Sequence, residues 1–127
     1  MSGRTNKFIL DLSYVFALKI VAYAEVLEKL RNYDEAGRLF KSGTSIGANI
    51  RDAQSSESND GFLYNLTYAV KEAEETEKRL RQYRNSEDYP DVNDLLKDIA
   101  IMKQLLKDMI SSVSSLKFQV SNSQFKR

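Results

Sequence analysis

Two polar side chains, Ser45 and Asn49, interrupt a stretch of small and apolar residues. Because they are four positions apart, they would lie one above the other on a single face of a helix. Their natural hydrogen-bond partners lie on a later segment: Glu72, Glu75 and Thr76. A buried polar group without a partner costs about 1–3 kcal/mol, so a buried pair would need such partners. The five residues predict a structural polar layer that fixes helix register, with a ligand or partner site and simple surface exposure as the alternatives.

The residue types present give little support to catalytic chemistry. The sequence has no histidine and no cysteine, so the commonest general base, the commonest metal ligand and a thiolate nucleophile are all missing. Ser45 has no histidine partner, and nothing else supports a serine–lysine dyad with Lys41. A di-iron bundle requires paired Glu-x-x-His motifs, of which Glu72 and Glu75 supply only carboxylates. The nearby glycines follow a helical pattern, unlike those of a nucleotide-binding turn. We therefore expect no enzymatic activity, no metal and no cofactor.

The length and charge of the chain limit the fold and the partners. Its 127 residues suffice for one domain with one buried core. Nineteen basic and 18 acidic residues give a formal net charge of +1, which argues against a strong, generic attraction to nucleic acid or membranes. With one proline and five glycines, the chain should form long regular elements. The absence of cysteine is compatible with a reducing compartment.

The first helical pattern is apolar over more than half of its circumference. Its main stripe recurs every three or four positions: Ile9, Leu12, Phe16, Ile20, Tyr23, Leu27 and Leu30. A second apolar row lies about 120° away on the helix: Leu10, Tyr14, Ala17, Val21 and Ala24. This row requires a partner outside the bundle. The segment imitates a secretory signal, but charged residues interrupt it, and no run reaches the roughly 18–20 apolar residues of a membrane span.

Short polar breaks divide the chain into four helices. They are predicted at residues 8–33, 35–55, 58–84 and 91–120, with a flexible tail at 121–127. Asp34, Ser58 and Asp91 are the expected N-cap residues. The last helix carries an unbroken apolar seam: Val92, Leu95, Ile99, Met102, Leu106, Met109, Val113, Leu116 and Val120. We predict a single all-α domain over residues 1–127, folded as an antiparallel up-down-up-down four-helix bundle.

The third helix combines a small-residue core stripe with an ordered charged face. Its stripe contains alanines at the middle: Phe62, Leu66, Ala69, Ala73, Thr76, Leu80 and Tyr83. Gly43 and Gly47 are expected to pack closely against these alanines. Acidic residues precede basic ones, which predicts three i,i+4 ion pairs: Glu74–Lys78, Glu75–Arg79 and Glu77–Arg81. Most of this face should be solvated, but its basic end could contact nucleic acid: Lys78, Arg79, Arg81 and Arg84.

These residues together resemble a known family. The resemblance is carried by Ser42–Ile50, then Ser58 and Phe62, then Lys71–Ala73 with Glu75, Thr76 and Leu80. The sequence closely resembles the 23S ribosomal RNA intervening-sequence protein family, also called the four-helix-bundle family. The resemblance implies a small cytoplasmic bacterial protein, a left-handed bundle, a ring-like homopentamer and no established enzymatic activity. It places the characteristic polar residues of the family at Ser45, Asn49, Lys71, Glu72 and Glu75. Five positions depart from the family pattern: Lys41, Asp52, Gly61, Asn65 and Arg79.

Two functional hypotheses follow. The first is a non-catalytic homo-oligomeric protein of unknown cellular role, with the second apolar row of the first helix in the subunit interface. The second is a nucleic-acid-binding accessory protein, like the retroelement reverse-transcriptase accessory factors among distant relatives of the family. In that hypothesis the basic end of the third helix is repeated round the oligomer. RNA, DNA or another protein could be the partner, and no membrane is expected.

Overall fold

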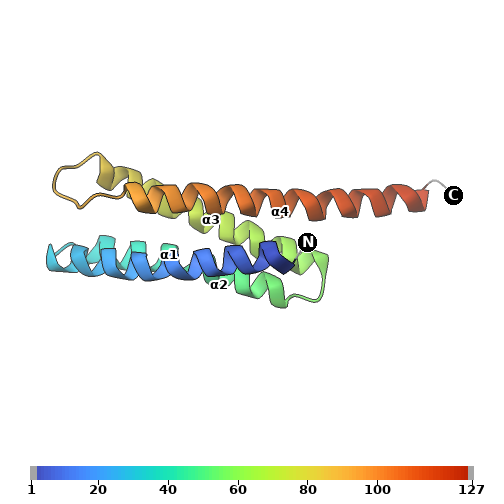
Figure 1. The fold of residues 1–127 in the computed structure, drawn as a ribbon, viewed down its shortest axis with the longest axis horizontal. Coiled ribbons are helices and arrows are strands. Elements are labelled where there is room, and N and C mark those ends of the chain that lie inside the picture. The colour runs from blue at the N-terminus through green and yellow to red at the C-terminus, as the bar shows by residue number, and fades with distance from the viewer. Residues whose placement is uncertain (1–2, 126–127) are drawn as a thin grey trace.

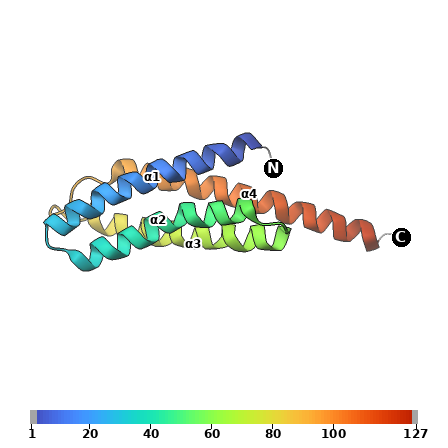
Figure 2. The same ribbon diagram turned by 90° about the horizontal axis from the view of Figure 1, so that it is seen from below.

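The computed structural model describes the backbone of residues 3–125 and the side chains of residues 7–115. Over this range the chain forms four α-helices and no strand: α1 (Gly3–Lys29), α2 (Tyr33–Ser55), α3 (Asn59–Arg84) and α4 (Asn93–Phe125). Consecutive helices run in opposite directions, and the C-terminal part of α4 extends past the other three (Figure 1, Figure 2). The all-α prediction is confirmed.

A backbone motif ends α1 at Lys29, earlier than predicted. Arg31 adopts the left-handed conformation, with a φ of 63°. The Asn32 N–H donates to the Leu27 carbonyl at 2.8 Å, and the Arg31 N–H donates to the Glu28 carbonyl at 2.9 Å. These two bonds form a Schellman motif, a common helix stop. Because glycine normally occupies the left-handed position, an arginine there gives no sequence signal.

The helix starts agree with the predicted caps at two of three places. The Ser58 hydroxyl accepts a hydrogen bond from the Gly61 N–H at 3.0 Å, as predicted. The Asp91 carboxylate accepts one from the Asn93 N–H at 2.9 Å, at the start of α4. Asp34 was wrong as a cap because α2 already begins at Tyr33. It lies instead in the first turn, where a negative charge is favourable next to the helix dipole.

The predicted end of the last helix at residue 120 is wrong, whereas the flexibility predicted for residues 121–127 stays a prediction. The backbone of α4 is helical to Phe125, and residues 126–127 lie outside the described range. No glycine or proline occurs after Pro90, so nothing in the chain chemistry stops the helix at residue 121.

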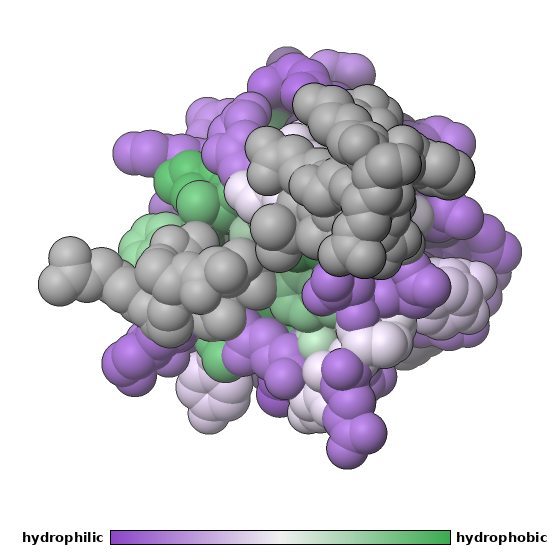
Figure 3. Space-filling view, turned by 90° about the vertical axis from the view of Figure 1, so that its right-hand side faces the viewer, coloured by the Kyte–Doolittle hydropathy of each residue, from purple (hydrophilic) through white to green (hydrophobic). Residues whose placement is uncertain are grey.

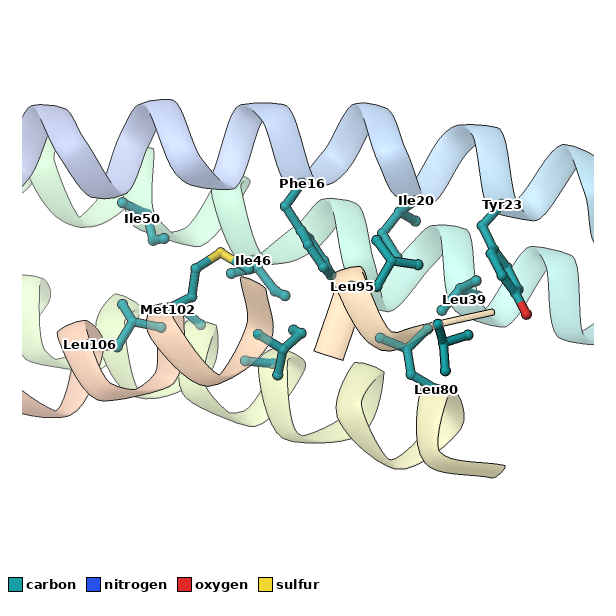
Figure 4. Close-up of a cluster of buried hydrophobic side chains, with 14 of the residues drawn as sticks. Phe16, Ile20, Tyr23, Leu39, Ile46, Ile50, Leu80, Leu95, Met102 and Leu106 are labelled. Carbon is teal, nitrogen blue, oxygen red and sulfur yellow. The ribbon is translucent and has the colours of Figure 1, made fainter. Parts of the chain in front are cut away.

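One apolar core lies along the bundle axis, and all four helices contribute to it (Figure 4). The predicted stripes are buried over most of their lengths. Leu12 and Phe62 are only partly buried, and Leu30 is exposed because α1 ends before it. On α4 the seam is buried from Val92 to Met109 and half-buried at Val113, whereas the side chains of its last two members, Leu116 and Val120, lie outside the described range.

The glycines of α2 pack against α1, which corrects the prediction that they face α3. A Cβ atom on Gly43 would lie 2.8 Å from both Cγ atoms of Ile20, and one on Gly47 would lie 3.2 Å from the Ser13 Oγ atom. The α3-facing side of α2 carries Ser42 instead, which contacts Thr76. Each residue turns the helix by about 100°, so one step from Ser42 to Gly43 changes the neighbouring helix.

Each helix packs against two neighbours, with α1 and α3 both between α2 and α4. The contact between α1 and α4 is the least extensive of the four. Lys19 connects these two helices, because its ammonium lies 2.7 Å from the Asp94 carboxylate and 2.9 Å from that of Asp98. These hydrogen bonds raise the pKa of Lys19 above its ordinary value. The bond to Asp94 contributes most, and the bond to Asp98 contributes next.

Candidate functional site

The predicted polar layer joins α2 to α3 through Ser45 and Glu72. The Ser45 hydroxyl lies 2.7 Å from the Glu72 carboxylate. The Thr76 hydroxyl lies 2.9 Å from the Ser42 Oγ atom and 2.8 Å from the Glu72 carbonyl oxygen. Ser42 was missed from the sequence, although it precedes Ser45 by three residues and so shares its helix face.

The remaining predicted members lie apart from these contacts. The Asn49 side chain donates to the Ser45 carbonyl at 2.9 Å, a bond within its own helix. Glu75 pairs with Arg79 at 2.8 Å. The layer therefore contains hydroxyl groups and one carboxylate, and no amine or imidazole base contacts Ser45 among the described residues. Such contacts can position two helices, but they do not activate a serine nucleophile.

A second polar network surrounds Glu35 in the first turn of α2. The Arg79 guanidinium donates to both Glu35 carboxylate oxygens, at 3.0 and 3.2 Å, and the Tyr83 hydroxyl donates to the same carboxylate. Arg79 is held between Glu35 and Glu75, and only 15% of its side chain is exposed. Arg79 is therefore unsuited to the nucleic-acid contact predicted for it. Glu35 gave no sequence signal because its partners lie more than 40 residues later.

A polar cavity opens beside this network, between the start of α2 and the end of α3. Its volume is about 260 Å³, and it is lined by Glu35, Arg38, Glu75, Lys78, Arg79 and Gln82. Within the described part of the chain, Arg38 and Lys78 form no ion pair. The Nε atom of Arg79 is shielded from solvent and has no hydrogen-bond partner there. The cavity thus contains unpaired positive charge next to a fixed network.

The other predicted cations are exposed on α3. Arg81 lies 3.6 Å from Glu77 in one of the predicted i,i+4 pairs, and Lys78 and Arg84 are exposed. The predicted pair between Glu74 and Lys78 does not form among the described residues. Glu77 also accepts from Lys103 at 3.0 Å, which connects α3 to α4.

Two exposed tyrosines occupy the same helix, toward its start. Tyr64 and Tyr68 are 61% and 41% exposed, and their ring centroids lie 4.9 Å apart. The Lys71 ammonium lies 5.2 Å from the centroid of Tyr68, within the range of a cation–π contact. These tyrosines were missed from the sequence, although their i,i+4 spacing on a polar face was a usable signal.

Three tyrosines connect the helix turns at one end of the bundle. The Tyr83 ring lies 5.8 Å from Tyr23 and 5.0 Å from Tyr89, measured between centroids. The Tyr23 hydroxyl donates to the Pro90 carbonyl at 2.9 Å, and the Asn32 amide donates to the Tyr89 hydroxyl at 2.7 Å. The α1–α2 turn is thereby tied to the α3–α4 connection.

Burial of this cluster predicts a loss of stability at high pH. Burial raises the pKa of Tyr23 to about 12, and burial with the Glu35 hydrogen bond raises the pKa of Tyr83 further. Both hydroxyls keep their protons in the folded state but lose them near pH 10 when unfolded, so stability falls as pH rises above about 10. We expect urea midpoints to fall between pH 8 and 11, by the equivalent of about 1 kcal/mol per tyrosine.

The matched variants for this test are Tyr83→Phe and Tyr33→Phe. The first removes a buried hydroxyl and should reduce the pH dependence of the urea midpoint, whereas the second removes an exposed one and should leave it unchanged. An equal pH dependence in wild type and Tyr83→Phe would contradict the assignment.

The outer side of α1 differs from the predicted second apolar row. Ala24 is buried, and Leu10, Ala17 and Val21 are half-buried within the subunit. The glycines of α2 let that helix approach α1 closely and cover part of the row. Tyr14 (61%) is the member of the predicted row that is exposed, and the other exposed apolar residues on this side are Phe8 (53%), Val15 (45%) and Leu18 (55%). Viewed from the end where α4 extends, the described surface has apolar areas inside a largely hydrophilic rim (Figure 3).

Comparison with known proteins identifies the fold family. The family model of the 23S rRNA-intervening sequence protein matches residues 6–110. The chain belongs to this family. The crystal structure of a protein of unknown function from the S23 ribosomal protein family of Bacteroides thetaiotaomicron is similar, with 31% sequence identity and a TM-score of 0.79. The similarity covers 84% of this chain and 98% of that chain. A search of curated proteins found no match.

The part of the chain that matches the 23S rRNA-intervening sequence protein family includes all the contacts described above. Neither the family description nor the related structure supplies a catalytic role. Among the described residues, no acidic cluster is arranged to hold a metal ion. No helix within that range combines the length and apolar character needed to cross a membrane.

Proposed function

We propose that this protein is a non-catalytic component of the bacterial cytoplasm that assembles into a ring-like homopentamer. The exposed apolar side of α1 carries the proposal: Phe8, Tyr14, Val15 and Leu18 lie within three turns of one helix. Single exposed apolar residues are normal on a protein surface, but a group of this size is typical of an interaction site. The subunit number of five is the expectation from the family resemblance.

Exposed apolar residues on the two helices next to α1 also favour a ring-like assembly. A closed ring uses two different surfaces of each subunit, one for each neighbour. On α2, Phe40 is exposed three residues before Gly43, on the side that faces α1. On α4, Ile101 is exposed three residues after Asp98, again on the α1 side. Apolar residues therefore flank α1 on both sides, which suits a head-to-tail contact.

Three further observations favour a non-catalytic role in the cytoplasm of a bacterium. The sequence contains neither histidine nor cysteine, and the Ser45 hydroxyl is engaged by Glu72. The absence of cysteine suits a reducing compartment. The related crystal structure is from a bacterium, Bacteroides thetaiotaomicron.

Substitution of Leu18 tests the interface. Wild-type protein should elute from size-exclusion chromatography with a light-scattering mass several times the subunit mass of 14.6 kDa. Leu18→Glu places a charge in the apolar contact, and we expect its mass to fall toward that of a single subunit. Leu30→Glu is the control, because Leu30 has similar exposure but lies beyond the end of α1. A wild-type monomer would overturn the proposal, and an oligomeric Leu18→Glu would overturn the choice of interface.

A nucleic-acid-binding accessory function is the second candidate. The observation that favours it is the exposed, unpaired charge of Lys78 and Arg38 at the cavity, with Arg84 further along α3. Repetition round an oligomer would turn a weak site into a multivalent one. Salt-dependent binding of RNA is the test, because the phosphate contribution weakens as salt rises.

A further inference from the structure

The outer face of α3 carries an aromatic pair in line with two lysines. Tyr64 and Tyr68 are one helical turn apart, and both expose ring surface. Lys71 follows Tyr68 by three residues, and Lys78 follows Lys71 by seven, so all four share one side of the helix. Aromatic rings combined with cations on one surface are the arrangement by which proteins hold single strands without reading their sequence.

The cavity gives this line a second contact point. Lys78 lies at the cavity, and Arg38 reaches the same cavity from α2. The charge of Arg79 is already balanced by Glu35 and Glu75, so Arg38 and Lys78 are the groups free to meet an anion. At 1.5 Å per residue, Lys78 is about 15 Å from Tyr68 along the helix axis. That distance is within the span of a few nucleotides.

The charge of this face favours stacking over electrostatic attraction. The cavity is lined by three cationic and two anionic side chains, so its net charge is small. A ligand held mainly by phosphate contacts would need a stronger positive field. The tyrosine rings offer a contribution that depends little on salt, because every base has an aromatic face.

We propose that the outer face of α3 binds single-stranded nucleic acid, with bases stacked on Tyr64 and Tyr68 and a phosphate held by Arg38 and Lys78. This inference rests on the second candidate function and specifies its ligand. In this inference the main contact with the nucleic acid is made by the tyrosines at the start of α3, and not by the basic residues at its end. A partner protein is less suited, because Thr67 and Lys71 are exposed polar residues within one turn of Tyr68, where an interface centre would be apolar.

Fluorescence anisotropy with a labelled single-stranded RNA of about 12 nucleotides tests the inference at ~50 mM salt, where phosphate contacts are strongest. The Tyr64→Ala/Tyr68→Ala variant should bind at least about tenfold more weakly, and Tyr64→Phe/Tyr68→Phe should keep its affinity, because phenylalanine also stacks. Tyr33→Ala, an equally exposed tyrosine on α2, is the control and should bind as wild type does. Duplex RNA should bind more weakly, since its bases are already stacked.

The salt dependence separates the two contacts. One phosphate held by Arg38 and Lys78 predicts a slope of log K against log salt of about −0.7 for a single strand. Arg38→Gln/Lys78→Gln should bring that slope close to zero while the tyrosine effect persists.

Three outcomes would overturn the inference. Binding that is insensitive to the alanine pair but lost on substitution of Arg81 and Arg84 would overturn it and leave the second candidate function standing. An absence of wild-type binding at ~50 mM salt would overturn both. A changed subunit number in the alanine variant, without RNA binding by wild type, would show that the tyrosines form a protein interface.

Discussion

Replacement of Gly43 by leucine is expected to lower the free energy of unfolding by about 3 kcal/mol. Even a single methyl group at this position would lie 2.8 Å from the Cγ atoms of Ile20. Ile20 is fully buried and β-branched, so it cannot turn aside without disturbing the core. The strain outweighs the roughly 1 kcal/mol that leucine gains over glycine in helix propensity.

Gly37→Leu is the matched control, because it makes the same change on the same helix. A Cβ atom at Gly37 meets nothing within 4 Å, so this variant should be more stable by about 0.5–1 kcal/mol. Urea unfolding followed by circular dichroism at one fixed protein concentration measures both effects. Ile20→Ala should partly rescue Gly43→Leu, with a coupling energy of about 0.5–3 kcal/mol. Equal stability of the two leucine variants would contradict the packing of α2 on α1.

Truncation of Phe16 to alanine is expected to cost about 3–5 kcal/mol, the largest effect of any single substitution considered. Phe16 is fully buried, and its ring points into the apolar core to which Ile46 and Leu95 also belong (Figure 4). The substitution removes both the transfer free energy of the ring and its packing contacts, and it leaves a cavity that rigid helices can only partly close.

Phe8→Ala, two turns earlier on the same helix, provides the comparison. More than half of the Phe8 side chain is exposed, so the stability of the isolated subunit should change by no more than about 0.5 kcal/mol. If α1 forms the subunit interface, Phe8→Ala should instead weaken association, measured as the protein concentration at which the oligomer dissociates. A large loss of subunit stability in Phe8→Ala would contradict the burial assigned to these two residues.

Sequence periodicity predicted those parts of the fold that depend only on which face of its own helix a residue occupies. The seam of α4 is the clearest case, since Ile99, Met102 and Leu106 recur with helical spacing and are all buried. Ser58 was predictable as a cap for the same reason, because its partner is only three residues away. Residue spacing within one helix therefore predicts burial on that helix and contacts between residues a few positions apart.

The features that the sequence did not predict depend on which helices become neighbours. Gly43 could have packed on either adjacent helix, and only the assembled bundle directs it to Ile20. The Glu75–Arg79 pair was predicted because the two residues are four positions apart on one helix, but the second partner of Arg79, Glu35, is 44 positions away and gave no local signal. Arg31 takes a conformation that usually needs glycine, so its role as a helix stop could not be inferred from residue type.

The subunit number is the property on which the proposed function depends most directly. Native mass spectrometry of the wild-type protein at micromolar concentration measures it without any substitution. We predict a dominant species of five subunits, each of 14.6 kDa. A spectrum that contains only the single subunit would contradict the proposed ring and the interface on α1.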